Sequence, residues 1–453
     1  MVHDLSPFAP QALERTVPRY TSYPTAPHFT DAVTADTYWR WLARQPAAAP
    51  LSLYLHIPFC ARLCWFCACR TQGARDYAPV DRYLGHLEAE IAMIGARLGP
   101  DHPVSQMHWG GGSPTIMRAE DMHRLYRAVE RVFPGIRSAE MAVEIDPRDI
   151  TEARMDALAQ IGITRGSIGV QDFEPCVQSA IGREQGFPLT RSVVEGLRAR
   201  GVAGINIDLL YGLPCQTEAS LRRTVEAVIS LKPDRVALFG YAHVPWMSRR
   251  QKLIDVESLP GVSARQAQAV MAGALLAGAG YQPVGIDHFA LPGDAMAAGA
   301  QDGTLKRNFQ GYTVDPAETL IGMGASSIGM LPEGYVQNIG RTAEWQKAVS
   351  AGQVPVARGH ALTLDDRPRQ AAIQQILCSF ALDAGALVDR FGDFARPVIA
   401  QMHALMAAAP EGALLPRPGG FEIAPAWQMH TRLIAAEFDS FLAARPARHS
   451  LAV

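Results

Sequence analysis

Four of the seven cysteines stand close together, and their spacing from Cys60 through Cys64 and Cys67 to Cys69 is CxxxCxxCxC. Cysteine thiolates hold iron–sulfur clusters, and a cubane 4Fe–4S cluster normally takes four of them. A loop that supplies three close thiolates can hold three corners of the cube and leave the fourth iron free to chelate an amine and a carboxylate. The methionine end of S-adenosylmethionine carries both groups, so this spacing indicates a cluster that binds that cofactor.

Other interpretations of these cysteines stay open at this level. A structural zinc ion also takes four thiolates, although such sites usually pair two separated CxxC units. The remaining cysteines, Cys176, Cys215 and Cys378, are isolated and are interpreted as ordinary core or surface thiols. A tight cluster in a reducing compartment favours metal or redox chemistry over disulfides.

Glycines and polar residues follow the next predicted strands. The segment His108–Thr115 contains three consecutive glycines, which let a backbone approach a ligand closely. Glu144, Gln171 and Asp208 stand at or near the ends of later strands, and Ala242 follows the sixth. Such ends converge on one mouth of a parallel barrel, where the carboxylates could accept hydrogen bonds from ribose hydroxyls. Each of these residues alone could equally be a helix cap or a surface group.

The elements that position these residues alternate regularly. Short β-rich runs and amphipathic helical stretches follow one another, which argues for parallel β/α units. This pattern alone does not separate an open barrel from a doubly wound sheet. The predicted strands are Leu51–Ile57, Val104–Trp109, Met141–Ile145, Arg165–Val170, Gly204–Leu210 and Arg235–Gly240. The predicted helices are Ala35–Arg44, Val80–Arg97, Ala119–Val132, Thr151–Gln160, Leu189–Arg200, Glu218–Leu231 and Ser263–Ala277, followed by an extended run at Tyr281–Phe289.

We expect three parts along the chain. Residues 1–35, rich in Pro, Thr and Tyr, form an N-terminal arm, and residues 36–350 form the catalytic β/α domain. Residues 351–453 form a mainly helical C-terminal domain, with helices near Asp366–Cys378 and Phe394–Ala408. The segment Lys306–Met330 is rich in Gly, Ser and Thr and is expected to be a loop that closes over the site.

Composition excludes several classes of protein. The 453 residues carry 42 basic and 44 acidic side chains, which is not the charge of a nucleic-acid-binding protein. The N-terminus has no basic and apolar signal sequence, and the most apolar stretch is too short and too rich in glycine to span a bilayer. We therefore expect a cytoplasmic enzyme with no membrane partner, and nothing in the sequence demands an oligomer, so a monomer is expected.

The cysteine loop resembles the signature of the radical S-adenosylmethionine superfamily. Longer blocks resemble oxygen-independent coproporphyrinogen III oxidases, and this likeness runs through nearly the whole chain. The most discriminating pieces are Cys69, where the related heme chaperones usually carry an aromatic residue, and the NFQGYT block. The matching blocks are Pro18–Thr25, Tyr54–Cys60, His108–Thr115, Gly285–Ala290 and Arg307–Thr313.

The resemblance implies a fold and a set of site residues. The fold class is α/β, an open (partial) parallel β/α barrel of about six units with an N-terminal arm and a small α-rich C-terminal domain. Cys60, Cys64 and Cys67 would hold the 4Fe–4S cluster, and the implied catalytic residues are Tyr54, His56 and Cys69. S-adenosylmethionine would be contacted by Tyr54, Phe66, Gly111, Gly112, Ser113, Glu144, Gln171, Arg183, Asp208, Ala242 and Ile328. The family typically has Thr in place of Ser113, and the hydroxyl is retained.

The resemblance also implies the reaction. Two propionate side chains of coproporphyrinogen III lose carbon dioxide and become vinyl groups through a 5′-deoxyadenosyl radical, which gives protoporphyrinogen IX for heme biosynthesis. The enzyme would be an oxidoreductase, a coproporphyrinogen dehydrogenase, with an electron donor and an electron acceptor that the sequence does not identify. Arg19 and Arg307 are candidates for substrate carboxylates because guanidinium pairs with them bidentately, and Gln310 is a third candidate. The alternative is another tetrapyrrole-directed relative, namely a heme chaperone, a methyltransferase or a heme-degrading enzyme.

Overall fold

The computed structural model describes residues 6–444 and 450–451, and its centre is a twelve-stranded sheet. Neighbouring strands run in the order β16-β15-β14-β13-β1-β4-β5-β6-β7-β8-β10-β9. The strands from β13 to β8 are parallel, and antiparallel strands extend both edges. The parallel strands are β1 (Leu51–Ile57), β4 (Val104–Gly111), β5 (Glu140–Ile145), β6 (Arg165–Gln171), β7 (Gly204–Tyr211), β8 (Arg235–Gly240) and β13 (Thr319–Met323).

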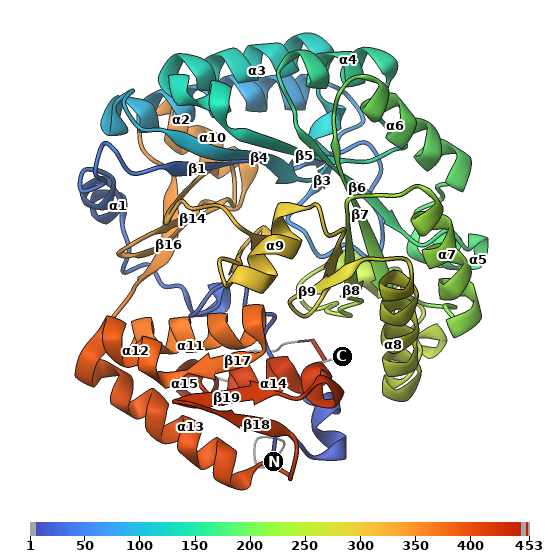
Figure 1. Cartoon of the computed structure of the whole chain (residues 1–453). Coiled ribbons are helices and arrows are strands. Elements are labelled where there is room, and N and C mark those ends of the chain that lie inside the picture. Colours follow the sequence, from blue (N-terminus) through green and yellow to red (C-terminus); the bar gives the residue numbers. More distant parts are fainter. Residues whose placement is uncertain (1–5, 445–449, 452–453) are drawn as a thin grey trace.

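Helices cover the outer face of this curved sheet (Figure 1). In β1, Leu53, Leu55 and Ile57 are fully buried, while Tyr54 and His56 alternate with them and therefore lie on the opposite, inner face. The predicted open β/α barrel is confirmed. The covering helices are α2 (Ala78–Leu98), α3 (Ala119–Val132), α4 (Glu152–Gln160), α5 (Pro175–Ile181), α6 (Phe187–Ala199), α7 (Glu218–Ser230) and α8 (Val262–Gly278), with α1 (Ala35–Leu42) and α10 (Thr342–Ser350) beside α2.

The expectation of a loop over Lys306–Met330 was wrong. This segment contains β11 (Lys306–Asn308), β12 (Gly311–Thr313) and the fully buried β13, and β14 (Ile328–Leu331) begins in it. Its glycines serve close packing, because a Cβ on Gly322 would lie 2.6 Å from the carbonyl oxygen of Ile328. The extended run expected near Tyr281–Phe289 is a short hairpin of β9 (Gln282–Val284) and β10 (His288–Ala290), followed by α9 (Ala295–Asp302).

The sheet continues beyond residue 351, where we expected the C-terminal domain to begin. β15 (Gly334–Asn338) pairs with β16 (Val356–Ala361), and a separate hydrophobic core follows from α11 (Asp366–Ser379) onward. That core includes a three-stranded sheet of β17 (Ala381–Asp383), β19 (Gly420–Ile423) and β18 (Leu414–Arg417). Its other helices are α12 (Ala384–Phe391), α13 (Arg396–Ala408), α14 (Thr431–Ala436) and α15 (Ser440–Ala444).

The N-terminal arm packs on this C-terminal unit (Figure 1). Phe8, Leu13 and Val17 of the arm are buried in the same core as Ile373 and Phe421. The two ends of the sequence therefore share one hydrophobic core in the described part of the chain. Among the residues that the structure describes, no helix combines the length and the apolar character needed to cross a bilayer.

Candidate active site

The cysteine loop begins where β1 ends. Two residues later β2 (Phe59–Cys60) pairs in parallel with β3 (Gln72–Gly73), and this pairing closes the neck of the loop. Cys64 and Cys67 lie between these two short strands. Because β1 is a central strand of the sheet, the loop stands on a rigid base.

The glycine segment after β4 supports that base. The backbone N–H of Gly112 donates to the Ile57 carbonyl at 2.9 Å, and Ser113 N–H donates to the Phe59 carbonyl at 2.7 Å. A Cβ on Gly112 would lie 2.5 Å from the Phe59 carbonyl oxygen. Glycine is therefore required at this position for the two segments to approach each other.

Three side chains from the segment that follows β8 form hydrogen bonds with the other side of the cysteine loop. The Gln251 side chain donates to the carbonyls of Phe66, at 2.6 Å, and Ala242, at 3.0 Å. Ser248 Oγ donates to the Cys67 carbonyl at 2.9 Å, and Arg250 donates to the Cys69 carbonyl at 3.1 Å. Sequence reasoning missed all three contacts, since a polar turn that satisfies backbone carbonyls has no periodic signature.

Cations surround the Cys64 thiol. Nη2 of Arg148 lies 3.2 Å from Sγ and Nη1 of Arg183 lies 3.5 Å from it, while Asp146 binds both guanidinium groups. Hydrogen bonding from Cys69, offset in part by burial, lowers the pKa of Cys67 to about 6. The lowered pKa favours the thiolate form of Cys67, which is the form that binds iron.

The chemistry of the donors fits the predicted cluster. Cys60, Cys64 and Cys67 are free thiols on one loop, and three such thiolates can each hold one iron of a 4Fe–4S cubane. Within the described ranges, no three His, Cys, Asp or Glu side chains converge closely enough to hold a single metal ion.

Glu144 lies at the centre of the predicted cofactor contacts. Its Oε2 accepts from Gly111 N–H at 2.9 Å, and its Oε1 lies 3.4 Å from Nε2 of His108. Gly111 has φ of +110°, and a Cβ there would lie 2.4 Å from the His56 imidazole. The backbone N–H thus reaches the carboxylate only because this residue is glycine.

Asp208 provides a second carboxylate. It accepts from the Asn206 amide at 2.7 Å and from Ser167 Oγ at 3.3 Å. Burial, with the charge of Glu144, raises its pKa to about 6. At neutral pH the group is therefore ionised and can accept further hydrogen bonds.

The remaining predicted cofactor residues are spread over one strand end, the start of another strand and several loops. Gln171 has φ of +71° at a register shift between β6 and β7, and Arg183 donates to the Gly169 carbonyl beside it. Phe66 packs in a small apolar cluster, and Ile328 begins β14 at the other edge. The structure gives Phe66 and Ala242 a shared contact through Gln251 and does not give Ile328 a contact with either.

The three predicted catalytic residues border the loop. Tyr54 Oη lies 3.0 Å from Nδ1 of His56, whose Nε2 lies 3.3 Å from the carbonyl oxygen of Arg70. Burial lowers the pKa of His56 and raises that of Tyr54, so both side chains are neutral near pH 7. The Cys69 backbone N–H donates to Cys67 Sγ at 3.4 Å.

The three predicted substrate residues divide between two cavities. Arg19 and Arg307 line one of about 130 Å³, where Arg307 forms a bidentate pair with Asp287. Gln310 lines another, of about 230 Å³, inside the barrel. The Nε2 atom of Gln310 is buried and has no hydrogen-bond partner among the described residues.

Comparisons with known proteins agree with this geometry. The Radical SAM superfamily matches residues 54–228. An oxygen-independent coproporphyrinogen III oxidase of Cereibacter sphaeroides is 46% identical over 425 residues, covering 94% of each chain. One from Bradyrhizobium diazoefficiens is 44% identical and covers 97% of this chain and 98% of its own.

A solved structure extends the likeness to three dimensions. The coproporphyrinogen III oxidase of Escherichia coli, described as a radical SAM enzyme, has a TM-score of 0.89 at 34% identity and covers 94% of this chain and 100% of its own. The resemblance inferred from the cysteine, glycine and NFQGYT motifs is confirmed. The chain belongs to the oxygen-independent coproporphyrinogen III oxidase family of the radical SAM superfamily.

Proposed function

We propose that this protein is the oxidoreductase that converts coproporphyrinogen III to protoporphyrinogen IX in heme biosynthesis without oxygen. Two propionate side chains lose carbon dioxide and become vinyl groups. The observation that carries this proposal is the loop with Cys60, Cys64 and Cys67 standing directly on the strand ends that bear Gly111 and Glu144. An iron–sulfur cluster on this loop would therefore lie next to a cofactor bound at these strand ends.

The cluster ligands in this proposal are Cys60, Cys64 and Cys67. When bound, the 4Fe–4S cluster and S-adenosylmethionine supply a 5′-deoxyadenosyl radical that removes hydrogen from a propionate β-carbon. Arg148 and Arg183 hold the Cys64 thiol in a cationic environment. The protein's own contribution is to position the reacting groups and exclude water.

The cofactor contacts follow the geometry of the strand ends. Glu144 and Asp208 accept hydrogen bonds from the cofactor's hydroxyl or ammonium groups, and Phe66 packs on its adenine. The backbone from Gly111 to Ser113 binds its methionine end. The other proposed contacts are Tyr54, Gln171, Arg183, Ala242 and Ile328.

Tyr54, His56 and Cys69 are proposed as catalytic residues. The Tyr54–His56 hydrogen bond connects the inner face of β1 to the loop. Both side chains are neutral, so they can pass or hold a proton without placing a buried charge beside the cluster. Arg19, Arg307 and Gln310 are the proposed substrate contacts. We further propose that the enzyme is a cytoplasmic monomer that uses a separate electron donor and acceptor.

An anaerobic assay tests the proposal. Protein with its cluster is supplied with coproporphyrinogen III, S-adenosylmethionine and a reductant, and the products are identified by mass spectrometry. We expect the loss of two carbon dioxides together with release of 5′-deoxyadenosine. A gain of methyl groups would indicate a methyltransferase, and tight heme binding without 5′-deoxyadenosine would indicate a heme chaperone.

A further inference from the structure

Two exposed cysteines outside the cysteine loop lie in contact with each other. Cys176 belongs to α5, and Cys215 stands in the segment between β7 and α7. Their thiols share a hydrogen bond, although about forty positions separate them in the sequence. The interpretation of these two residues as isolated thiols was therefore wrong.

The fold holds the two segments that carry these cysteines against each other. β6 and β7 are neighbouring parallel strands, and the two segments follow their adjacent ends. Asp172 accepts from the Gln216 side chain at 2.6 Å and from Thr224 Oγ1 at 2.9 Å. Val177 and Leu213 are fully buried in one apolar cluster. The contact between the two thiols therefore rests on packed and hydrogen-bonded surroundings.

The backbone at Cys215 is unusual for a cysteine. Its φ is +61°, in the left-handed region that glycine, and occasionally Asn or Asp, adopts routinely. Its N–H donates to the Ser258 carbonyl at 2.9 Å, which helps to hold this conformation. Strained residues of this kind cluster at functional sites. Glycine would form the same turn without strain, so the strain is explained if the thiol itself has a role.

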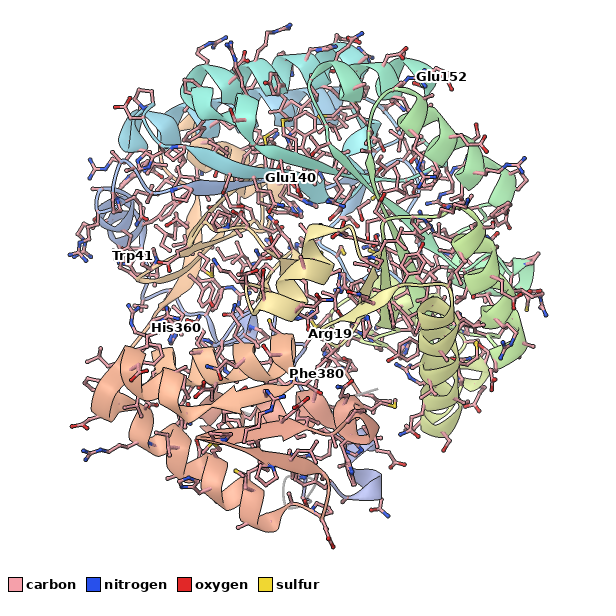
Figure 2. The ribbon with its side chains drawn as sticks, in the orientation of Figure 1. Arg19, Trp41, Glu140, Glu152, His360 and Phe380 are labelled. Carbon is pink, nitrogen blue, oxygen red and sulfur yellow. The ribbon has the colours of Figure 1, made fainter. Side chains whose placement is uncertain are left out.

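Both thiols can be reached from solvent. Cys176 and Cys215 are exposed, and α5 and α7 lie beside each other at the edge of the molecule (Figure 1). Side chains along this edge point outward (Figure 2). Reactive cysteines are accessible, whereas structural buried ones are inert. Cys378, which is only 5% exposed, provides the contrast within the same chain.

We propose that Cys176 and Cys215 form a reversible disulfide by exchange with a low-molecular-weight disulfide such as oxidised glutathione. This modification goes beyond the proposed function and does not depend on it. Two thiols in contact need little movement to reach disulfide geometry, in which the Cβ atoms lie ~3.5–4.5 Å apart. The disulfide would add a covalent link beside the Asp172–Gln216 hydrogen bond, close to Gln171 at the end of β6.

The exchange has two steps. Burial, and then the hydrogen bond with Cys176, raises the pKa of the Cys215 thiol, so the proton stays on Cys215 and the Cys176 thiolate attacks first. A bond forms between the Cys176 sulfur and one sulfur of oxidised glutathione, and the other sulfur leaves as a glutathione thiolate. Cys215 then loses its proton and attacks the Cys176 sulfur, which expels the second glutathione. Two protein thiols are oxidised, one glutathione disulfide is reduced, and the two protons end on the two glutathione thiols.

The test is mass spectrometry of the cluster-loaded protein after anaerobic treatment with oxidised glutathione. The remaining thiols are alkylated, and trypsin then cuts after Arg183 and Arg200, which places the two cysteines on separate peptides. We expect these peptides to be joined, with a mass two hydrogens below their sum, and to separate again after reduction. Cys378 is the internal control and should stay reduced, because it is buried.

The single variants Cys176→Ser and Cys215→Ser sharpen the test. Each should carry glutathione on the remaining cysteine, with at least ~10-fold more adduct than wild type, because only wild type has an adjacent thiol that resolves the mixed disulfide. Separate glutathione adducts on both cysteines of wild type, or two unmodified thiols, would overturn the inference. The measurement does not require turnover, so either result leaves the proposed function to its own assay.

Discussion

The two regions that we propose as binding sites have opposite charge and opposite construction. The strand-end region around Glu144 and Asp208 is acidic and is built from consecutive β/α units. The cavity lined by Arg19, Arg307 and Arg432 is basic and is assembled from the N-terminal arm, the barrel and the C-terminal unit. The first charge suits a cofactor with sulfonium and ammonium groups, and the second suits a substrate with four carboxylates.

This difference teaches how the enzyme separates its two ligands. In the proposed arrangement, the acidic strand ends favour the sulfonium and ammonium groups of the cofactor, and the basic cavity favours the carboxylates of the substrate. The comparison is tested by substituting residues in one region and measuring whether ligand binding at the other region is retained.

The largest effect is expected from Cys64→Ser. Loss of one of three thiolates should abolish cluster binding and all turnover, while coproporphyrin III binding is retained because the basic cavity does not depend on iron. Iron analysis and the visible spectrum of anaerobically purified protein measure the first result, and a fluorescence titration measures the second. Cys176→Ser, at an exposed cysteine outside the loop, should keep both iron and activity. An active Cys64→Ser enzyme would refute the cluster assignment.

Asp287→Asn should destabilise the basic region. It leaves the Arg307 charge buried, at 4% side-chain exposure, and a broken buried pair costs about 3 kcal/mol in the free energy of unfolding. Because the folded-state pKa of Asp287 is depressed, the stabilisation is present above about pH 4 and is lost as pH falls through the folded pKa. Chemical denaturation at pH 7 gives the measurement.

The control for this change is Asp393→Asn. Asp393 pairs with Arg396 at a fully exposed site, where both side chains are more than three-quarters solvent-accessible. Such pairs contribute little, so this variant should unfold like wild type. An equal loss in both variants would show that the buried pair has no special role.

Gly111→Ala tests whether the backbone beside Glu144 contributes to cofactor binding in the acidic region. The new methyl group would strike His56 and move the N–H that donates to Glu144. S-adenosylmethionine should bind about tenfold more weakly, because a hydrogen bond to a charged group such as the Glu144 carboxylate contributes ~1.5–3 kcal/mol to the positioning of this acceptor. Calorimetric titration measures this effect. Gly99→Ala has a similar φ, +86°, with nothing within 4 Å of the added Cβ, and should leave cofactor affinity unchanged.

The smallest effect is the pH dependence of cofactor binding. Asp208 has a pKa raised to about 6, and only its ionised form is a full acceptor. Affinity for S-adenosylmethionine should therefore rise about tenfold between pH 5 and pH 7. The groups that face Asp208 are Glu144, His288, Asn206 and Ser167. Asp208→Asn should flatten this rise, and a profile that stays as steep would assign it to another group.

The acidic region could be predicted from sequence because its parts are local. The strand β1 leads directly into the cysteine loop, and Glu144 and Asp208 stand at the ends of recognisable strands. The basic region could not be predicted in full. Arg432 lies more than four hundred residues from Arg19, and no periodic pattern joins an N-terminal arm to a C-terminal helix. β13 was missed for a related reason, since five residues with a glycine among Gly- and Ser-rich neighbours look like a loop until they pair with β1.

The place of β1 between β4 and β13 has a consequence for biosynthesis. The strand that carries the iron-binding loop gains its second neighbour from residues 319–323, about 260 positions after Cys60. At ribosomal speeds of ~5–20 residues per second, that neighbour emerges ~15–50 s after the cysteines. We expect metal delivery to follow completion of the nascent chain, and the bare thiols to need shielding from oxidants until then.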